Sequence, residues 1–380
     1  MDTGFRDLAG WRVGLVTNPT ARVDTADGGP AHLIDRLAEA PNVTLAALFG
    51  PEHGLRGTAE AGARVTSGRD AQTGAPVYSL YGATRKPTRA QLDGLDALVF
   101  DVQDVGARFY TYVSTMGLAM QAAADAGIPF VVLDRPNPLG DRVEGWTMEP
   151  THTSFVGMYP IPITHGMTVG ELARMIRGEG WLDGLEALDL RVVAMEGYRR
   201  GMPWEDAALP WVPPSPNVPD VETARVYPGI ALFEGTTASE GRGTETPFLV
   251  FGAPWLDADA LLAQIEAEGV AAEPVAFTPR DLPGRATNPK HEGRTVHGLR
   301  LTVTDPSAFE PVRLGAALLR EVYRLAPEAE RRRFFDDAWL AKLAGTTRLA
   351  RALRAGEPIP SWEADVEAFR RQRAPYLLYE

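Results

Sequence analysis

The chain of 380 residues carries 50 acidic and 38 basic side chains, which gives a net charge of −12, and it contains no cysteine. The acidic balance argues against a nucleic-acid-binding surface, and the lack of cysteine excludes disulfides, thiolate metal sites and a cysteine nucleophile. The length suits about two or three domains. Because the six histidines show no HExxH spacing, we expect no metal and no cofactor.

The amino terminus lacks the apolar core of a signal peptide, and the chain has no apolar run of about 18 residues. We therefore expect no membrane insertion and, for the sequence as given, a cytoplasmic protein. A truncated start would instead allow a periplasmic or secreted location. The sequence assigns no oligomeric state.

The first elements follow the order strand, helix, strand. Val13–Val16 predicts a buried strand, and the polar turn Thr17–Thr20 follows it. Within that turn, Asn18 is a candidate for substrate binding. Pro30 is expected to open a helix, whose apolar face would hold Leu33, Ile34 and Leu37. Residues 43–49 then predict a second buried strand, parallel to the first.

This second strand leads into Glu52 and His53. In open α/β sheets, ligands bind at the carboxyl ends of the strands, so both residues are catalytic candidates. For an arbitrary Glu-His pair, two solvated surface side chains would be the simpler interpretation. Three glycines within residues 50–57 permit close backbone approach, and Arg56 adds a positive charge. These neighbours favour a binding site.

Residues 97–100 predict another strand, which leads into a second polar cluster and then a helix. Asp101 directly follows the strand, so we favour a structural role for it. Asp104 stands further out and is the better candidate for contact with a ligand. Arg108 could pair with one of these acids or bind a substrate carboxylate, and the sequence does not separate the two. The cluster ends with two further candidates, Tyr110 and Tyr112.

Residues 130–133, 167–178 and 190–194 predict a strand, a helix and a strand. The loop after the first of these contains Asn137, a candidate for substrate binding. It also contains Asp134, for which a turn-stabilising or ion-paired role is at least as favoured as catalysis. Thr168 and Glu171 have capping-box spacing, which supports the helix. The alternation of strands and helices predicts an α/β fold with a doubly wound parallel sheet and right-handed crossovers.

Proline, tryptophan and asparagine crowd into residues 203–219, which can form neither a regular helix nor a central strand. We place a domain boundary there, which gives domains 1–212 and 213–380. One interpretation of the segment is a stiff linker. The other is a crevice wall, in which Trp211 offers an apolar face and Ser215 and Asn217 offer hydrogen bonds to a sugar.

The second half predicts a smaller mixed α/β domain with a helical C-terminus. Its loop Ser239–Pro247 is rich in Ser, Thr and Gly and forms a candidate anion site with Arg242, which could instead pair with Glu240. Helices are expected around residues 261–265 and 314–325, and a strand at 299–303. Ser361 is expected to cap the last helix, and the basic cluster Arg370–Arg373 to be solvated.

The phosphate-binding motifs GxGxxG and GxxxxGK[ST] and the nucleophile elbow GxSxG are missing from the sequence. These absences argue against a bound nucleotide and against a serine-hydrolase triad. What remains at the strand ends is a set of acids and hydrogen-bonding groups. Such a set suits glycoside hydrolysis, in which one carboxyl group protonates the leaving oxygen and a second group attacks or activates water.

Seven short motifs follow one another along the chain: Thr17–Thr20, Gly50–Gly54, Asp101–Tyr112, Arg135–Pro138, Pro214–Asn217, Tyr227–Gly229 and Gly241–Thr244. With the ending Tyr376–Tyr379, they resemble the NamZ (YbbC-like) exo-β-N-acetylmuramidase family. The resemblance implies a Rossmann-like domain followed by a smaller α/β domain, with the active cleft between them. It also implies removal of β-1,4-linked N-acetylmuramic acid from the non-reducing end of peptidoglycan-derived glycan fragments. Well-known members are exported, and this sequence departs from them in showing no signal.

The resemblance places the family's proposed catalytic glutamate at Glu52, with His53 beside it. We predict Glu52, His53 and Asp104 as catalytic residues. The residues predicted to bind substrate are Asn18, Arg56, Arg108, Tyr110, Tyr112, Asn137, Ser215, Asn217 and Arg242. The alternative function is a non-catalytic module that binds a muropeptide or sugar. A nucleotide-dependent oxidoreductase has only the fold in its favour.

Overall fold

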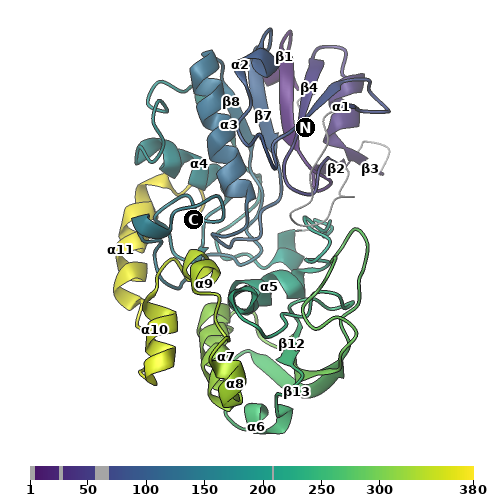
Figure 1. The fold of residues 1–380 in the computed structure, drawn as a ribbon. Helices are drawn as coiled ribbons and strands as arrows, with labels where there is room; N and C mark the ends of the chain where they lie inside the picture. The colour runs from purple at the N-terminus through teal and green to yellow at the C-terminus, as the bar shows by residue number, and fades with distance from the viewer. Residues whose placement is uncertain (1–4, 25–28, 56–67, 208) are drawn as a thin grey trace.

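The computed structural model describes residues 5–24, 29–55, 68–207 and 209–380. Figure 1 shows two lobes, an upper lobe built on a large sheet and a lower lobe built on a small one. The upper sheet has seven strands, and neighbouring strands in it are parallel except for the last pair. Its order is β11 (Leu190–Val193), β8 (Phe130–Leu133), β7 (Ala97–Asp101), β1 (Arg12–Thr17), β4 (Thr44–Gly50), β6 (Pro76–Ser79) and β5 (Gly68–Arg69).

The strand order reverses at β1. From β1 the chain moves outward through β4 to β6, then returns to the other side of β1 and moves outward through β7, β8 and β11. In such a sheet, ligands bind at the carboxyl ends of the strands where the order reverses. The loops that leave β1, β4 and β7 there carry Asn18, Glu52 and Asp104.

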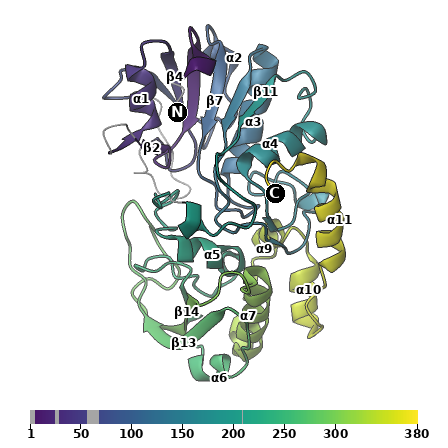
Figure 2. The same cartoon turned by 180° about the vertical axis from the view of Figure 1, so that it is seen from behind.

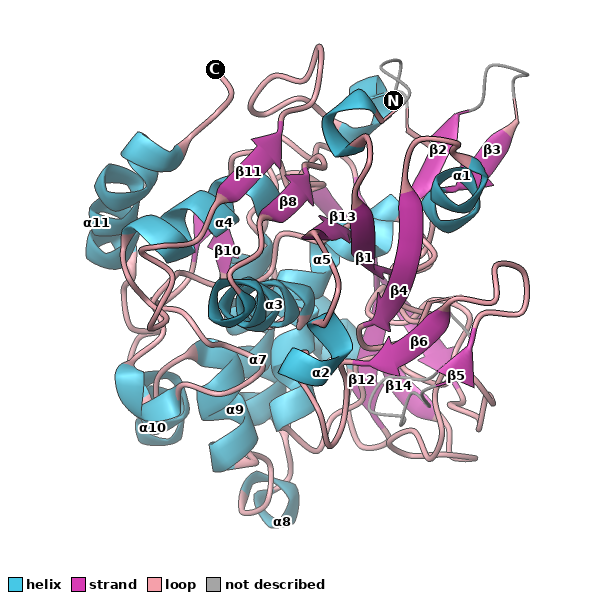
Figure 3. Cartoon of the chain, turned by 90° about the horizontal axis from the view of Figure 1, so that it is seen from above, coloured by secondary structure: helices cyan, strands magenta, loops and turns pink. Residues whose placement is uncertain are grey.

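Helices cover both faces of this sheet. Side chains of a strand alternate between the faces, so Leu98 and Phe100 of β7 join the core on one side, and Ala97 and Val99 join the core on the other. The first side is covered by α2 (Arg89–Leu92), α3 (Tyr112–Ala126) and α4 (Val169–Gly178), the second by α1 (Leu33–Glu39). Figure 3 shows α1 and α3 on opposite sides of the strands. The predicted doubly wound α/β sheet is confirmed.

The sequence predicted the start of α4 correctly, but it predicted the start of α1 too early. Thr168 and Glu171 form the predicted capping box at the start of α4. The segment Pro30–His32 is instead a short strand, β3, paired with β2 (Arg22–Asp24), and helix α1 begins at Leu33. The ring of His32 accepts a hydrogen bond from the backbone N–H of Ile34 at 3.1 Å. A histidine therefore caps the helix that proline was expected to open.

The lower lobe contains the antiparallel sheet β12 (Val250–Ala253), β14 (Val296–Val303) and β13 (Val270–Phe277). Helices α5 (Val221–Ile230) and α7 (Pro311–Leu325) pack against each other through Gly229 and Gly315, where a Cβ on either residue would collide with backbone atoms. The lobe also contains α6 (Ala258–Leu262), α8 (Glu328–Arg331) and α9 (Asp337–Ala344). Two short strands, β9 (Val143–Glu144) and β10 (Thr164–His165), pair with each other. The boundary placed after residue 212 stays a prediction.

The last helices, α10 (Arg348–Ala355) and α11 (Glu363–Arg373), lead the chain back to the upper lobe, as Figure 2 shows. Arg373 is buried and donates to the backbone oxygens of His165 and Gly166 at 2.8 and 2.6 Å. The prediction of a solvated cluster is therefore wrong for Arg373, because buried carbonyls need donors. Trp362, not Ser361, occupies the cap position of α11. Within the described ranges, no helix is long and apolar enough to cross a membrane.

Candidate active site

A cavity of about 230 Å³ lies between the lobes. Seven of the predicted site residues line it, namely Glu52, His53, Tyr110, Tyr112, Ser215, Asn217 and Arg242. Four others do not line it: Asn18, Asp104, Arg108 and Asn137. Arg56 lies outside the described residues. Further lining residues that the sequence did not single out are Tyr81, Phe109, Thr111, Val156, Val218, Tyr227, Glu234, Phe248, Trp339 and Leu343.

Glu52 and His53 follow directly from the end of β4, and both are buried. The backbone of His53 is left-handed, with φ of 69°, and Gly54 continues with φ of 72°. The Gly54 N–H closes the turn on the Pro51 oxygen at 3.0 Å. A left-handed histidine costs roughly 1–2 kcal/mol, which the surrounding packing must offset. The turn brings two successive side chains, Glu52 and His53, to one cavity.

Hydroxyl groups surround the Glu52 carboxylate. Thr111 donates its hydroxyl hydrogen to Glu52 Oε2 at 2.7 Å. The Tyr81 hydroxyl also bonds to this carboxylate, and burial together with the charge of Glu52 raises the pKa of Tyr81 well above its usual value. Tyr112 donates its hydroxyl to Pro214 O at 2.5 Å and lies 3.4 Å from Glu52 O. The carboxylate is thus held by two side chains from different segments, Thr111 before α3 and Tyr81 after β6.

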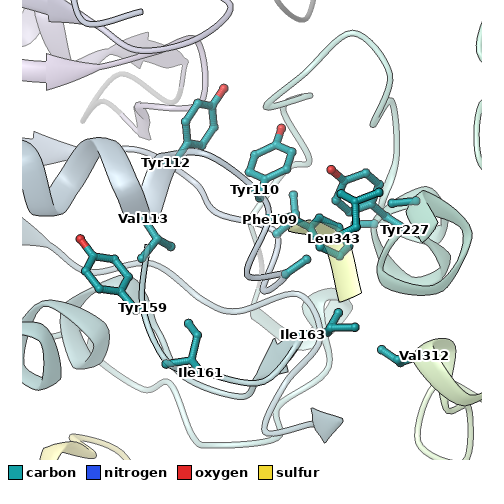
Figure 4. Packing of buried hydrophobic residues seen from close by; sticks show 14 of the residues in the cluster. Phe109, Tyr110, Tyr112, Val113, Tyr159, Ile161, Ile163, Tyr227, Val312 and Leu343 are labelled. Atoms are coloured by element: carbon teal, nitrogen blue, oxygen red, sulfur yellow. The ribbon is translucent and has the colours of Figure 1, made fainter. Parts of the chain in front are cut away.

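An aromatic wall forms one side of the cavity. The ring of Tyr110 meets Tyr112 and Tyr227 edge to face, with centroids 4.9 and 5.8 Å apart. Tyr227 in turn meets Phe248 at 4.9 Å. Figure 4 shows Tyr110, Tyr112 and Tyr227 side by side, although they come from both lobes. Such a wall offers apolar ring surface beside hydroxyl groups, which suits a sugar with both C–H and O–H groups.

The lower lobe contributes charges. Arg242 Nη2 lies 2.9 Å from Glu234 Oε1, and Arg242 Nε lies 3.6 Å from Glu240 Oε1. Lys290 Nζ lies 3.0 Å from the other oxygen of Glu240. Burial by itself would lower the pKa of Arg242, but the charges of Glu234 and Glu240 outweigh it and raise that pKa. Arg242 therefore forms the alternative ion pair with Glu240, with Glu234 as a nearer partner, while it still faces the cavity.

The proline-rich segment reaches the cavity with its last residues. Ser215 accepts a hydrogen bond from Asn217 N at 3.2 Å, and Asn217 donates to Arg285 O at 2.7 Å. Both line the cavity. Trp211, by contrast, packs on Trp204 with ring centroids 5.0 Å apart and is not a lining residue. Part of the segment is therefore a cavity wall, as one of the two interpretations held.

The predicted residues outside the cavity hold the loops in place. Asn18 accepts hydrogen bonds from Thr20 N at 3.0 Å and from the Thr20 hydroxyl. Asp104 accepts from Gly106 N at 2.7 Å. Asn137 donates to Met167 O at 3.0 Å and accepts from Leu139 N at 2.9 Å. Short polar side chains that bond to nearby backbone fix turns.

Arg108 pairs with no acid among the described residues, and it does not line the cavity. It donates to the backbone oxygens of Trp146 and Ile161, both at 2.6 Å, and to Leu343 O at 2.8 Å. Burial lowers the pKa of Arg108 to about 9. The guanidinium connects the upper lobe to the end of α9. The other two acids weighed from the sequence are structural: Asp101 pairs with Arg135 at 2.5 Å, and Asp134 accepts from Thr168 and Gly170.

Comparison with known proteins identifies the family. The model for the N-terminal part of exo-β-N-acetylmuramidase NamZ matches residues 13–222, and the model for its C-terminal part matches residues 225–379. The chain belongs to the NamZ family. The peptidoglycan β-N-acetylmuramidase NamZ of Bacillus subtilis strain 168 is 45% identical over 382 residues, which covers 98% of this chain and 88% of that protein.

Two crystal structures of DUF1343 family proteins from Bacteroides fragilis have the same fold. The first has a TM-score of 0.88 and 36% identity, and the second has a TM-score of 0.79 and 34% identity. Each comparison covers 100% of this chain and 97% of the other. The NamZ motifs that are far apart in the sequence meet in this fold: Gly50–Gly54, Asp101–Tyr112, Pro214–Asn217, Tyr227–Gly229 and Gly241–Thr244 all contribute to the cavity.

Some of the lining residues that the sequence did not single out could have been found from these motifs. Thr111 lies between Tyr110 and Tyr112, and Tyr227 opens a motif of its own. Tyr81 lies two residues after the end of β6 and outside the seven motifs. Glu234 had no signal, because a single acid in an otherwise apolar stretch is typical of a surface residue.

Asp104, though outside the cavity, is expected to make stability depend on pH. It is buried 3.9 Å from His165, whose pKa burial lowers to about 3, so the imidazole is neutral at ordinary pH. Burial raises the pKa of Asp104 from 3.8 to about 7, against the opposing effect of backbone N–H groups. Between pH 3.8 and about pH 7, the folded protein therefore keeps a proton on Asp104 that the unfolded chain has lost. The free energy of unfolding falls as the pH rises through this range.

An Asp104→Asn variant cannot ionise. Its free energy of unfolding relative to the wild type should therefore increase from pH 4 to pH 8, by about 2–4 kcal/mol. Chemical denaturation at both pH values measures this change. The exposed Asp259→Asn variant is the control and should show the same difference at both. An Asp104→Asn difference that is equal at pH 4 and pH 8 would mean that Asp104 does not titrate in this range.

Proposed function

We propose that the protein is an exo-acting glycoside hydrolase. It releases β-1,4-linked N-acetylmuramic acid from the non-reducing end of peptidoglycan-derived glycan fragments. The observation that carries the proposal is the position of Glu52, a carboxylate bonded to hydroxyls in a cavity between the lobes of a NamZ family member. The 45% identity to an enzyme named for this activity supports the reaction class.

The size of the cavity supports attack at a chain end. Its volume of about 230 Å³ is below the roughly 300–1,000 Å³ of most small-molecule sites. A site of this size suits one terminal sugar unit rather than several units in a row. The aromatic wall would then pack against the sugar ring, and Ser215 and Asn217 would lie within reach of its hydroxyl groups.

In the proposed reaction, Glu52 protonates the oxygen that leaves the anomeric carbon. Its hydrogen bond to Thr111 and its burial hold the carboxyl group in the cavity, which supports this role. His53 adjoins Glu52 and lines the same cavity, which supports a contact with the leaving sugar. No cofactor enters this step, since protonation and addition of water need only acid and base groups.

The proposal is tested with 4-nitrophenyl β-N-acetylmuraminide in buffer without added metal or nucleotide. We expect release of 4-nitrophenol, and with a β-1,4-linked disaccharide we expect N-acetylmuramic acid only from the non-reducing end. Tight binding of the muraminide without release of 4-nitrophenol would instead show a non-catalytic binding module and contradict the hydrolase function. Release that requires an added nucleotide or metal would also contradict the proposal.

Arg242 is expected to select the sugar. N-acetylmuramic acid differs from N-acetylglucosamine by a lactyl carboxylate, and Arg242 is the one arginine or lysine among the described lining residues. A charge-assisted hydrogen bond is worth roughly 1.5–3 kcal/mol, so Arg242→Ala should lower the preference for muraminide by about 10- to 100-fold. The measurement is kcat/KM for matched muraminide and glucosaminide substrates.

The control for this prediction is Arg300→Ala, which removes an arginine on the lower sheet that pairs with Glu273 at 3.9 Å. It should keep the wild-type preference. If the Arg242→Ala protein stays folded and keeps the same preference, Arg242 does not bind the lactyl carboxylate and only forms ion pairs with Glu234 and Glu240.

A further inference from the structure

Two carboxylates line the cavity among the residues that the structure describes, Glu52 and Glu234. They come from opposite lobes: Glu52 follows strand β4, and Glu234 lies in the short 3₁₀ helix Ala231–Gly235. Glycoside hydrolysis requires a second group besides the acid, which attacks or activates water. The proposed function so far assigns only the first of the two.

The position of Glu234 is rigid. Lys290 Nζ donates to the backbone oxygens of Phe233, Glu234 and Ala238 at 2.8, 3.3 and 3.1 Å. A Cβ at Gly235 would collide with Leu340, so the segment packs tightly on α9. Lys290 also binds Glu240, which in turn contacts Arg242. The backbone that carries Glu234 is thus supported on several sides, as the backbone of a catalytic residue must be.

The two carboxylates have different surroundings. Glu52 is buried and bonded to hydroxyls, whereas Glu234 is partly exposed and bonded to the guanidinium of Arg242 at 2.9 Å. The negative charge of Glu234 also acts on Tyr227: burial first, and then this charge, raise the pKa of that tyrosine. Two carboxylates in unlike surroundings can take different roles, with the more buried one as the acid and the one beside a cation as the base.

We propose that Glu234 is the general base of the reaction. This rests on the proposed hydrolase function. The Glu234 carboxylate removes a proton from a water molecule, whose oxygen forms the new bond to the anomeric carbon. The bond from that carbon to the leaving oxygen breaks, its electron pair stays on the oxygen, and the oxygen takes the proton of Glu52. Glu234 ends protonated and Glu52 ionised, and exchange with solvent restores both. The released sugar has the inverted, α configuration.

The first test is the anomer formed. Proton NMR of the wild-type reaction should show α-N-acetylmuramic acid before mutarotation. A product that appears first as the β anomer would overturn the assignment of Glu234 as base. If the wild type releases no sugar, the proposed function fails, whereas release with the β anomer leaves that function standing and removes only this inference.

The second test uses variants and 4-nitrophenyl β-N-acetylmuraminide. Glu234→Gln should lower kcat at least about 100-fold with KM little changed. Glu234→Ala should regain activity in sodium azide and form the α-glycosyl azide, because azide attacks without needing a base. The matched control is Glu328→Gln, an exposed acid of α8 that does not line the cavity, which should behave as wild type. Activity within a few-fold of wild type, or a loss that azide does not restore in a folded protein, would overturn the proposal and leave Glu234 as a support for Arg242.

Discussion

Replacing Glu52 with glutamine is expected to lower kcat for muraminide hydrolysis by about 100- to 10,000-fold, the range over which general acids contribute to catalysis. Glutamine keeps the size of the side chain and can still accept the hydrogen bond from Thr111, which is 2.7 Å long in the wild type. The variant should therefore fold normally and bind substrate. What it loses is the proton for the leaving oxygen.

Comparing two substrates with different leaving groups tests whether Glu52 supplies the proton to the leaving oxygen. The loss should be largest for a natural disaccharide, whose leaving oxygen needs the proton, and smaller for a 4-nitrophenyl substrate, whose leaving group departs without it. Steady-state kinetics with both substrates measures the difference. The exposed Glu39→Gln variant serves as control. A folded Glu52→Gln protein with activity within a few-fold of wild type on both substrates would remove Glu52 from the mechanism.

Arg108→Met is expected to destabilise the fold by about 3–5 kcal/mol. The variant fills a similar volume but leaves three buried carbonyl oxygens, those of Trp146, Ile161 and Leu343, without their donor. A buried acceptor that loses its partner costs about 1–3 kcal/mol. The loss should appear as a lower midpoint in urea unfolding.

The matched control is Arg332→Met, which removes an exposed arginine paired with Glu328. A surface pair of this kind is worth about 0–1 kcal/mol, so the midpoint should barely move. If Arg108→Met keeps the wild-type midpoint and instead raises KM for muraminide alone, the original expectation of a substrate-binding arginine would be restored.

The sheet and helix α4 could be predicted because their signals are local. Apolar runs of four to seven residues between turn-forming residues favour buried strands, and the capping box of α4 spans only Thr168 to Glu171. The roles of the polar residues were harder to predict. Arg108 donates to the backbone carbonyls of residues 146, 161 and 343. The sequence around residue 108 does not predict contacts with residues so far away in the chain.

The polar residues at the strand ends fall into two groups, those that face the cavity and those that bond to nearby backbone. Glu52 faces the cavity because a left-handed turn at His53 and Gly54 leads it there. Asn18, Asp104 and Asn137 occupy equivalent places after other strands, yet each is bonded to a backbone group of its own loop or a neighbouring one. Sequence alone locates the edge of the sheet where a site forms, whereas choosing among the residues on that edge requires the lower lobe, which closes over only some of them.

The return of the chain to its first lobe has a consequence for biosynthesis. Tyr379 donates its hydroxyl to Asp134 at 2.7 Å, and Leu378 N donates to Glu171 at 2.8 Å. Arg373 occupies the carbonyls of residues 165 and 166. The ribosome makes the amino-terminal part of the chain first. The upper-lobe groups therefore lack these contacts until the residues hundreds of positions further along the chain have been made. The amino-terminal lobe can collapse during translation, but it gains these contacts only after residues 373–379 have left the ribosome.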